Sequence, residues 1–558
     1  MSQHRRRPPA KKARQVRTRA VIVTAVAATV AAGVGLGLWA SGDGDRSGPT
    51  GTAAERPSDG KSASAGASPR QPRPSPSPSP TRSYPLSRTP RTIPAVAAHT
   101  PERGPGWRPR SGERVVVNAA ELADEGRLVA RELGLTYAGE KGDARSGDLR
   151  LALDDDAGGD PESYTMTVRG GQVTISGSAD AGVFYGTRTL KQAVHGGSAA
   201  PEGVVKDAPA KPVRGFMLDI ARKHYTAGWI EDRVRELGDL KFNELGLHFS
   251  DDQGFRIESR SHPEVVSDQH LTRAEVERII GLAAERHITI VPEIDSPGHL
   301  GAVIAAHPSL QLRNASGVAA RGAVDISQDA AATIVDELLD EYAGLFPGER
   351  WNLGGDEYRA LMVSNPEASY PQLATAAREA YGSGGTVADL TTGWLNDRAD
   401  TVRNHGKTLR AWNDGFFPGT SVQPAKDIQV AYWTGKEIGA RRPTDYLSAG
   451  RDLVNYNDLF LYYVLGQPNQ FSYPTGQRIY EQWTPRVVRG TQAVDATYDD
   501  QILGGSFAVW GDYPNAQTQD QVAAGIRLPL RAVVQKLWDA DKPSLTWAEF
   551  KSLADRLG

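Results

Sequence analysis

Short apolar runs and longer amphipathic stretches alternate through the C-terminal part of the chain. The amphipathic stretches, such as 228–241, 273–286 and 331–346, place apolar residues three or four positions apart, which is the period of a helix with one buried face. The apolar runs have the length of buried strands, and they lie at 213–220, 242–249, 288–294, 350–355, 408–412, 428–433, 452–457 and 506–511. Eight such alternations in roughly 350 residues predict a (β/α)8 TIM barrel rather than an open doubly wound sheet.

A smaller unit precedes the barrel, because the pattern between residues 112 and 207 contains shorter strands around few helices. Gly170 and Gly171 separate two alternating runs and suit a tight hairpin turn that requires positive φ. The expected elements are strands at 113–120 and 148–154, a hairpin at 164–177, and helices at 121–134 and 181–194. Since no catalytic constellation stands in this region, we predict an α/β support domain at 112–207 and a catalytic barrel at 208–558.

The N-terminus has the pattern of an export or anchoring segment. Residues 1–19 carry lysines and arginines but no acid, and residues 20–40 then run without a charge. A helix of that length, at about 1.5 Å per residue, spans roughly 30 Å, which is enough to cross a bilayer. The positive flank predicts that the N-terminus stays inside and the rest of the chain outside. Leu38-Trp39-Ala40 fits a small-x-small cleavage site poorly, so for residues 1–40 we favour a signal anchor over a cleaved signal peptide.

Composition narrows the remaining possibilities. Residues 41–111 are rich in Ser, Pro, Gly and Arg and poor in large apolar residues, which predicts a disordered linker that acts as a spacer. The chain has no cysteine, which excludes disulfides and Cys-bound zinc, and its formal net charge of −3 gives no general attraction to nucleic acid. No glycine-rich phosphate loop opens a helix in the barrel, and we expect no cofactor.

Polar and aromatic residues gather where the predicted barrel strands end. A TIM barrel presents the carboxyl ends of its strands on one face, where catalytic residues lie. A single acid or tryptophan there is usually structural, but such residues at all eight strand ends indicate a shared site. Aromatic rings stack on the C–H faces of sugars and carboxylates accept hydrogen bonds from hydroxyls, so we expect a carbohydrate substrate. The candidate residues are Arg222, Asp251, Asp295, His299, Asp356, Glu357, Trp412, Trp433, Tyr462, Trp510 and Asp512.

Several stretches resemble the motifs of glycoside hydrolase family 20, the β-N-acetylhexosaminidases. The matching stretches are RGFMLDIARKHY (214–225), KFNELGLHFSDDQGFRIES (241–259), VPEIDSPGH (291–299), WNLGGDEY (351–358) and AWNDG (411–415). DSPGH and GGDE together are highly specific, and the support domain also resembles the N-terminal domain of the family. The resemblance implies a retaining exo-hydrolase that removes terminal N-acetyl-β-hexosamine residues by substrate-assisted catalysis.

The resemblance also implies roles for the acids. Glu357 is expected to protonate the leaving glycosidic oxygen and later to activate water. Asp356 is expected to orient the 2-acetamido group and to stabilise an oxazolinium-like intermediate. Both side chains can serve one site only where the strand breaks into its loop, which the Gly-Gly pair before them allows. Glu357 should be protonated at rest, with Asp295 acting through His299 to adjust its pKa.

Binding roles follow from the same resemblance. Arg222 is expected to hold sugar hydroxyls by charge-assisted hydrogen bonds, and Asp251 to belong to the acid network. The walls of the acetamido pocket and the tyrosine that bonds its oxygen are matched by Trp412, Trp433, Trp510 and Tyr462, with Tyr463 as the alternative to Tyr462. Asp512 stands where the family often has Glu in contact with outer hydroxyls of the sugar. This departure leaves open whether the sugar is gluco- or galacto-configured and whether a mono- or a disaccharide is released.

Two alternatives to a simple exo-hexosaminidase stay open. One is a disaccharide-releasing glycosidase like the lacto-N-biosidases, and the other is a catalytically silent glycan-binding barrel at the cell surface, although both Asp356 and Glu357 are present. The acids Asp251, Asp252 and Asp295 with His299 resemble a metal cluster, but we expect them to form a hydrogen-bond network without a metal. The pattern predicts neither the natural glycan nor the oligomeric state.

The first testable prediction concerns location. Because a basic segment precedes an uncharged apolar run and a Pro-rich spacer, the barrel should lie outside the cell membrane, either anchored or secreted. Cell fractionation should therefore find the hydrolase activity in the membrane fraction or in the medium. Full activity in the cytosol, with none in the other two fractions, would contradict this expectation.

Overall fold

The computed structural model describes residues 83–140, 144–154, 159–197, 199–466, 472–539 and 543–558. The predicted membrane segment at 20–40 and most of the predicted linker at 41–111 lie outside these ranges. Within the described ranges, none of the helices has the length and apolar character needed to cross a bilayer.

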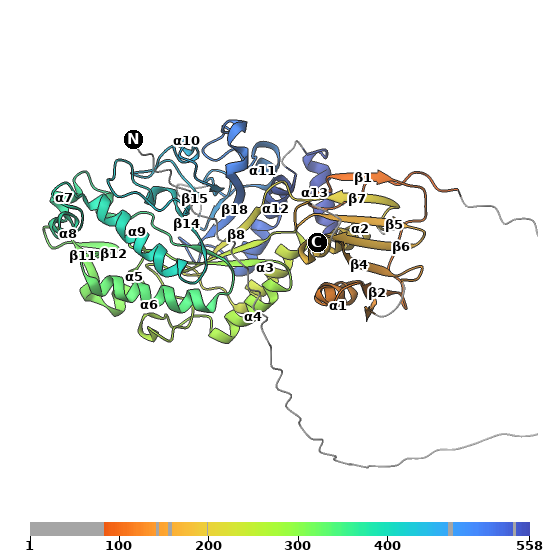
Figure 1. The fold of residues 1–558 in the computed structure, drawn as a ribbon, viewed down its shortest axis with the longest axis horizontal. Helices are drawn as coiled ribbons and strands as arrows, with labels where there is room; N and C mark the ends of the chain where they lie inside the picture. The colour runs from red at the N-terminus through yellow and green to blue at the C-terminus, as the bar shows by residue number, and fades with distance from the viewer. Residues whose placement is uncertain (1–82, 141–143, 155–158, 198, 467–471, 540–542) are drawn as a thin grey trace, which may run out of the picture. The chain divides into compact units, whose positions relative to one another are not determined.

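The N-terminal part of the described chain is a seven-stranded sheet with two helices against it (Figure 1). The strand order is β1-β7-β5-β6-β4-β2-β3. The elements are β1 (Ala98–Pro101), β2 (Arg114–Val117), α1 (Ala123–Leu133), β3 (Thr136–Gly139), β4 (Leu149–Leu153), β5 (Tyr164–Arg169), β6 (Gln172–Gly177), α2 (Asp180–Gly197) and β7 (Gly203–Asp207). The predicted hairpin is confirmed, because β5 and β6 pair antiparallel and Gly170 and Gly171 take φ angles of 61° and 76° between them.

The predicted end of the linker at residue 111 is wrong. Strand β1 lies inside the predicted linker and pairs antiparallel with β7. Trp107 is buried in the core of the sheet, and its indole N–H donates to the carbonyl of Gly147 at 2.8 Å. β1 is an edge strand with mostly exposed side chains and a terminal proline, Pro101, so it lacks the alternation by which half-buried strands are recognised.

Eight parallel strands close into a barrel, which confirms the predicted (β/α)8 fold. Their order is β8, β9, β10, β13, β14, β15, β16 and β18, and pairings of β18 with both β16 and β8 close the ring. The strands are β8 (Val213–Asp219), β9 (Glu244–Ser250), β10 (Thr289–Ile294), β13 (Arg350–Asn352), β14 (Thr408–Trp412), β15 (Gln429–Tyr432), β16 (Leu453–Asn455) and β18 (Ile502–Trp510). An additional strand that the pattern did not predict, β17 (Tyr462–Val464), pairs with the C-terminal part of β18, past the residues that pair with β16.

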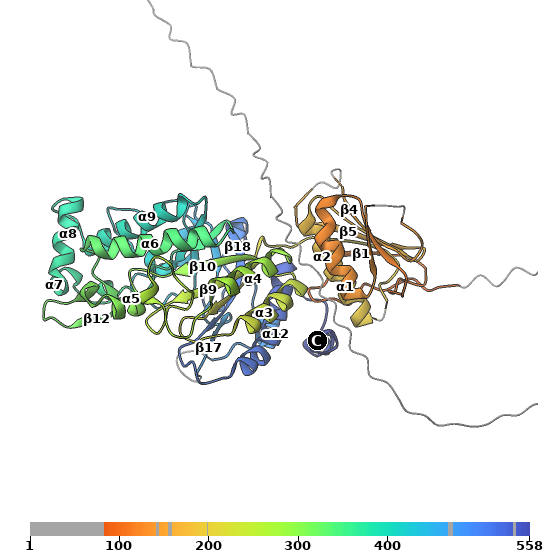
Figure 2. The same cartoon turned by 90° about the horizontal axis from the view of Figure 1, so that it is seen from below.

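Helices lie outside the ring of strands (Figures 1 and 2). They are α3 (Ala227–Asp239), α4 (Arg273–Ala284), α5 (Gly301–Ala306), α6 (Asp329–Leu345), α7 (Pro366–Ser369), α8 (Pro371–Tyr381), α9 (Val387–Arg403), α10 (Pro443–Leu447), α11 (Gly476–Gln482), α12 (Gln519–Trp538) and α13 (Trp547–Leu557). The short antiparallel pair β11 (Gln311–Arg313) and β12 (Ala319–Val324) follows α5. Helices α4, α9, α12 and α13 each begin at a threonine that forms a capping box, which explains why their starts are sharp.

Buried charges join the support sheet to the amino-terminal ends of the barrel strands. Trp538, at the end of α12, packs in the core of the support sheet, and its indole N–H donates to Asp207 at 2.9 Å. The ammonium of Lys241 lies 3.2 Å from the same carboxylate and 4.2 Å from the ring centre of Trp538. Burial lowers the pKa of Lys241 to about 8, although Asp207 opposes the shift. The guanidinium of Arg214, at the start of β8, likewise binds Glu162 at 2.7 Å.

Candidate active site

A cavity of about 700 Å³ opens at the carboxyl ends of the barrel strands. It is lined by Arg222, His248, Asp295, His299, Asp356, Glu357, Arg359, Met362, Trp433, Thr434, Lys436, Glu437, Asp458, Tyr462, Val464, Trp510, Asp512 and Tyr513. All but two of the predicted site residues thus line this cavity. The other two contact residues that line it: Asp251 forms an ion pair with Arg222, and Trp412 packs on Trp510 with ring centres 5.9 Å apart.

The two central acids lie in a loop that leaves β13 abruptly. The strand ends at Asn352, and Gly354 and Gly355 then adopt positive φ angles of 69° and 95°. A Cβ on Gly354 would overlap the carboxylate of Asp295, while the Gly355 N–H donates to that carboxylate at 2.7 Å. Only glycine satisfies both the left-handed backbone and the close approach. The expectation that Asp356 and its neighbour follow a break in the strand is therefore confirmed.

Asp414, which the sequence reasoning did not select, holds this loop in place. It lies in a 3-10 turn (Asn413–Gly415) directly after β14 and is buried. Its carboxylate accepts the backbone N–H of Glu357 at 3.1 Å and the indole N–H of Trp433 at 2.8 Å. Glu357 itself has a φ of 49°, an unfavourable angle for a residue with a Cβ, so this contact supports a strained position. Burial, together with the charge of Asp356, raises the pKa of Asp414 to about 8.

His299 lies at the centre of the acids. Its Nδ1 is 3.1 Å from Asp251, and its Nε2 is 3.5 Å from Glu357, 3.8 Å from Asp356 and 4.0 Å from Asp295. Burial disfavours the charged ring, but Asp251 and Asp295 outweigh it and raise the pKa of His299 well above its ordinary value. His299 therefore favours its protonated form, and it faces three carboxylates of the cavity. Asp295, His299 and Asp356 are also close enough to share an ion, so the expected absence of a metal stays a prediction.

The acids around His299 differ in the direction of their pKa shifts: the pKa is raised for Asp295 and Asp356 and lowered for Glu357. Burial and the neighbouring Asp295 raise the pKa of Asp356 well above its ordinary value, and burial raises the pKa of Asp295 to about 7. The contact with His299 lowers the pKa of Glu357. This direction is opposite to the expectation that Glu357 is protonated at rest. The reason is the 3.5 Å approach of the imidazolium, which the sequence does not reveal.

Arg222 is positioned by two buried acids. Its guanidinium binds Asp219 at 3.0 Å and Asp251 at 2.7 Å, and it lies 5.2 Å above the ring of Trp510. These contacts outweigh burial and raise the pKa of Arg222. Asp512, beyond the end of β18, also lines the cavity. A guanidinium held in this way presents a fixed cation at the cavity wall.

Aromatic rings form the apolar side of the cavity. Trp433 and Tyr462 stack with ring centres 5.7 Å apart and an interplanar angle of 6°, and Tyr462 lies 5.7 Å from Trp510. Tyr463 instead stacks on Tyr473 at 4.3 Å, outside the cavity lining. The structure therefore places Tyr462, and not Tyr463, at the site.

Other polar residues of the site were not among the predicted ones. His248 lies 2.9 Å from Asp251 and 2.7 Å from Glu293, which also accepts the indole N–H of Trp412 at 3.1 Å. Asp458 lines the cavity and binds Lys436 at 2.5 Å. His248 and Glu293 lie near the ends of β9 and β10, so their position could have marked them as site residues. The position of Asp458 gave no such signal.

Comparison with known proteins identifies the family. The model of the catalytic domain of glycosyl hydrolase family 20 matches residues 212–539, and the model of domain 2 of that family matches residues 89–208. The chain belongs to glycosyl hydrolase family 20. The match at 89–208 begins before β1, in agreement with the extent of the support sheet.

Relatives and solved structures of family 20 cover most of the chain. A lacto-N-biosidase of Bifidobacterium bifidum is 30% identical over 477 residues, which are 84% of this chain and 42% of that protein. A β-hexosaminidase of Porphyromonas gingivalis is 27% identical over 58% of this chain and 45% of its own length. The chain thus spans less than half the length of these two relatives. The β-N-acetylhexosaminidase structure of Streptomyces coelicolor A3(2) has a TM-score of 0.67 at 23% identity and covers 85% of this chain and 96% of its own.

The second prediction tests the contact between Gly354 and Asp295. Gly354→Ala places a Cβ against the carboxylate and also strains the backbone, whereas Gly406→Ala strains a similar backbone (φ 74°) with no atom in the way. The strain alone costs about 1–2 kcal/mol. Thermal unfolding should therefore show a clearly larger fall in Tm for Gly354→Ala than for Gly406→Ala. Equal falls in Tm would mean that the ends of β10 and β13 can move apart to admit the added Cβ.

Proposed function

We propose that this family 20 enzyme is a retaining exo-β-N-acetylhexosaminidase. The observation that carries the proposal is the position of Asp356 and Glu357, side by side in a cavity walled by aromatic rings. Asp356 lines the cavity, and its buried Oδ1 has no hydrogen-bond partner among the described residues, so a ligand N–H that reached this atom would satisfy it. The names of several relatives, β-hexosaminidases of Porphyromonas gingivalis and Vibrio furnissii among them, support this assignment.

The proposed reaction uses the substrate's own 2-acetamido group as the nucleophile. The acetamido oxygen forms a bond to the anomeric carbon while the glycosidic C–O bond breaks, and Glu357 gives its proton to the leaving oxygen. Positive charge then develops on the oxazolinium ring, and the carboxylate of Asp356 accepts its N–H and stabilises it. Glu357 next takes a proton from water, whose oxygen attacks the anomeric carbon and opens the ring with retained configuration.

The location of one proton links substrate binding to this reaction. The raised pKa values of Asp295 and Asp356 favour a proton on that pair, and the lowered pKa of Glu357 favours its ionised form beside His299. An acetamido N–H that binds Asp356 favours its ionised form. A sugar that fills the cavity also removes water from Glu357, which favours its neutral form. We propose that binding therefore shifts the proton to Glu357, with His299 between the two acids.

A second candidate function is the release of a disaccharide. Asp512 has a shorter side chain than Glu, and the cavity extends to Arg359, Lys436 and Tyr513, which are not needed for an acetamido pocket. The lacto-N-biosidase of Bifidobacterium bifidum is also 30% identical to the chain. Rates on p-nitrophenyl β-GlcNAc, β-GalNAc and β-lacto-N-bioside separate the two functions and the two sugar configurations.

We further propose that the enzyme acts outside the cell membrane on glycans with terminal N-acetylhexosamine. The basic residues 1–19 and the apolar residues 20–40 support this location. The spacer composition of the residues after them is consistent with a barrel held away from the membrane.

The third prediction separates the two acids by leaving group. Glu357→Gln should slow substrates with poor leaving groups by about 10²–10⁴, but activated aryl glycosides far less, because these need no proton. Asp356→Asn should slow both classes by about 10²–10³, since charge stabilisation is lost whatever leaves. The measurement is kcat for a disaccharide and for an aryl glycoside.

Asp232→Asn is the matched control, because Asp232 is exposed on α3, forms an ion pair with Arg235, and does not line the cavity. A thiazoline analogue of N-acetylglucosamine should inhibit strongly, and a plain β-glucoside should barely react. A covalent sugar trapped on a carboxylate of the enzyme would show that the proposed nucleophile is wrong.

The fourth prediction concerns the pH profile of kcat/KM, which reports groups of the free enzyme. The reactive form holds one proton among the cavity acids. It is lost on the alkaline side when the Asp295–Asp356 pair ionises, so that limb should lie near or above neutral pH. Asp295→Asn removes a charge that raises the pKa of Asp356, and the limb should move to lower pH. His299→Asn removes a cation that lowers it, and the limb should move to higher pH. Shifts in the same direction would contradict this assignment.

A further inference from the structure

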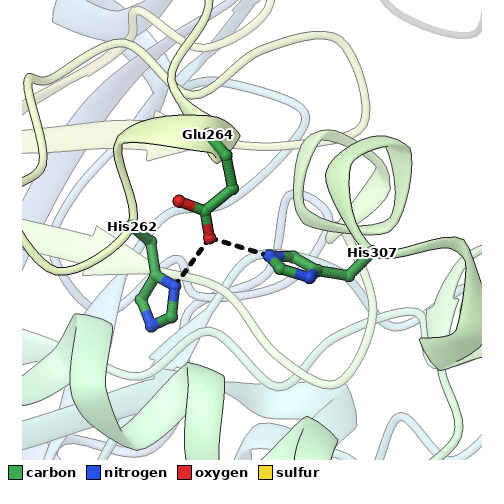
Figure 3. Close-up of side chains that lie close together, drawn as sticks. All are labelled: His262, Glu264 and His307. Atoms are coloured by element: carbon green, nitrogen blue, oxygen red, sulfur yellow. Dashed lines mark hydrogen bonds and ion pairs between the residues drawn. The ribbon is translucent and has the colours of Figure 1, made fainter.

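Two histidines and a glutamate meet away from the cavity, in a group that we call the histidine cluster: His262, Glu264 and His307. Figure 3 shows the Glu264 carboxylate between the two imidazole rings. Its Oε1 lies 2.9 Å from His262 Nδ1 and 2.9 Å from His307 Nε2. All three ligand atoms lie within 4.8 Å of one another. None of these residues lines the catalytic cavity.

We infer that the histidine cluster binds one divalent transition ion, with zinc as the best fit. Two imidazole nitrogens and one carboxylate oxygen are a donor set that suits zinc, whose bonds to such atoms are about 2.0–2.2 Å long. Hard cations such as calcium and magnesium prefer oxygen ligands only. Small movements of the three side chains would make room for an ion between the three ligand atoms. A water molecule would complete a tetrahedron.

The surroundings of His262 match those of a metal-bound histidine. Its second ring nitrogen, Nε2, lies 2.8 Å from Glu337 on α6. A neutral imidazole carries a single N–H, so when Nε2 donates to Glu337, Nδ1 presents its lone pair toward Glu264 and His307. Ligating histidines are held in this tautomer by a carboxylate on the opposite nitrogen. Without an ion, a proton on Nδ1 would instead form a hydrogen bond to Glu264.

The backbone around the cluster is fixed before any ion binds. Glu341 on α6 accepts the Ser259 hydroxyl at 2.8 Å and the Ser261 N–H at 3.0 Å, which holds the segment that leads to His262. The His307 N–H donates to the Val303 carbonyl at 2.9 Å and so closes α5. Ligands on held segments lose little conformational freedom on binding. The site is also accessible, since the side chains of Glu264 and His307 are 42% and 28% exposed.

The ion would connect two loops that carry residues of the candidate active site. His262 and Glu264 lie in the loop after β9, which begins with Asp251, and His307 ends the short helix that follows His299. A bond between the two loops would stabilise the folded protein without touching a reacting atom. Other groups fit less well among the described residues. Glu125, Asp180 and His287 offer one nitrogen, and the third group belongs to the cavity.

The fifth prediction is zinc uptake by the full chain. Chelator-treated protein, titrated with zinc alone and assayed by calorimetry and elemental analysis, should bind one equivalent and gain in Tm. His307→Ala and Glu264→Gln should lose this equivalent. Glu337→Gln should bind about 10–100-fold more weakly, because only the orienting carboxylate is removed. Hydrolytic activity below the unfolding temperature should survive chelation.

His405→Ala is the matched control, because His405 contacts a single carboxylate, Asp340 at 2.7 Å, and should leave zinc uptake unchanged. No uptake by the unmodified protein would overturn the inference, as would uptake that persists in His307→Ala or is lost in His299→Asn. The readout is metal content and Tm. The result therefore does not depend on whether the proposed hydrolase activity is correct.

Discussion

The contact between Asp295 and the Gly354–Gly355 backbone is the constraint on which the site depends. Closure of a parallel barrel brings the ends of β10 and β13 together, and here they approach so closely that no side chain fits between them. The chain must then leave β13 through left-handed backbone, which turns both Asp356 and Glu357 toward the cavity. A regular strand would have sent them to opposite faces. The pair of acids is therefore a product of strand closure and not of local sequence alone.

This arrangement concentrates acids that would repel one another. Buried carboxylates cost free energy unless they are paired, and the structure offsets the cost with basic side chains that include Arg222, His248 and His299. Arg222 serves the outer pair, Asp219 and Asp251, and His299 faces the inner acids. The raised pKa values of Asp295 and Asp356 favour a proton on the inner acids. In the proposed reaction, this is the proton that acid catalysis requires.

The sequence predicted the barrel closely and the site in large part. All eight strands lie where apolar runs placed them, because fully buried strands leave an unbroken apolar signal. Edge strand β1 has no such signal, whereas β17 lies in an apolar run at 459–465 that the alternation of eight strands and helices does not predict as a separate strand. The predicted residues that line the cavity were found by their place after strands, whereas lining residues such as His248, Glu437 and Asp458 were not predicted. Nor were Asp414 and Glu293, because each acts by holding another residue. The lowered pKa of Glu357 could not be predicted either, because it depends on the distance between Glu357 and His299, which lie in different loops.

The same proton explains why one substituent of the sugar would control both binding and reactivity. A hexose without the N-acetyl group lacks the nucleophile, but it also lacks the N–H that favours ionised Asp356. Under the proposed proton shift, such a sugar would leave the proton on the Asp295–Asp356 pair, and Glu357 would have none to give. Selectivity would then come from two failures that multiply, one in bond formation and one in acid catalysis. A pocket that recognised the acetamido group by shape alone would discriminate by contact energy only, and hydrophobic contacts discriminate weakly.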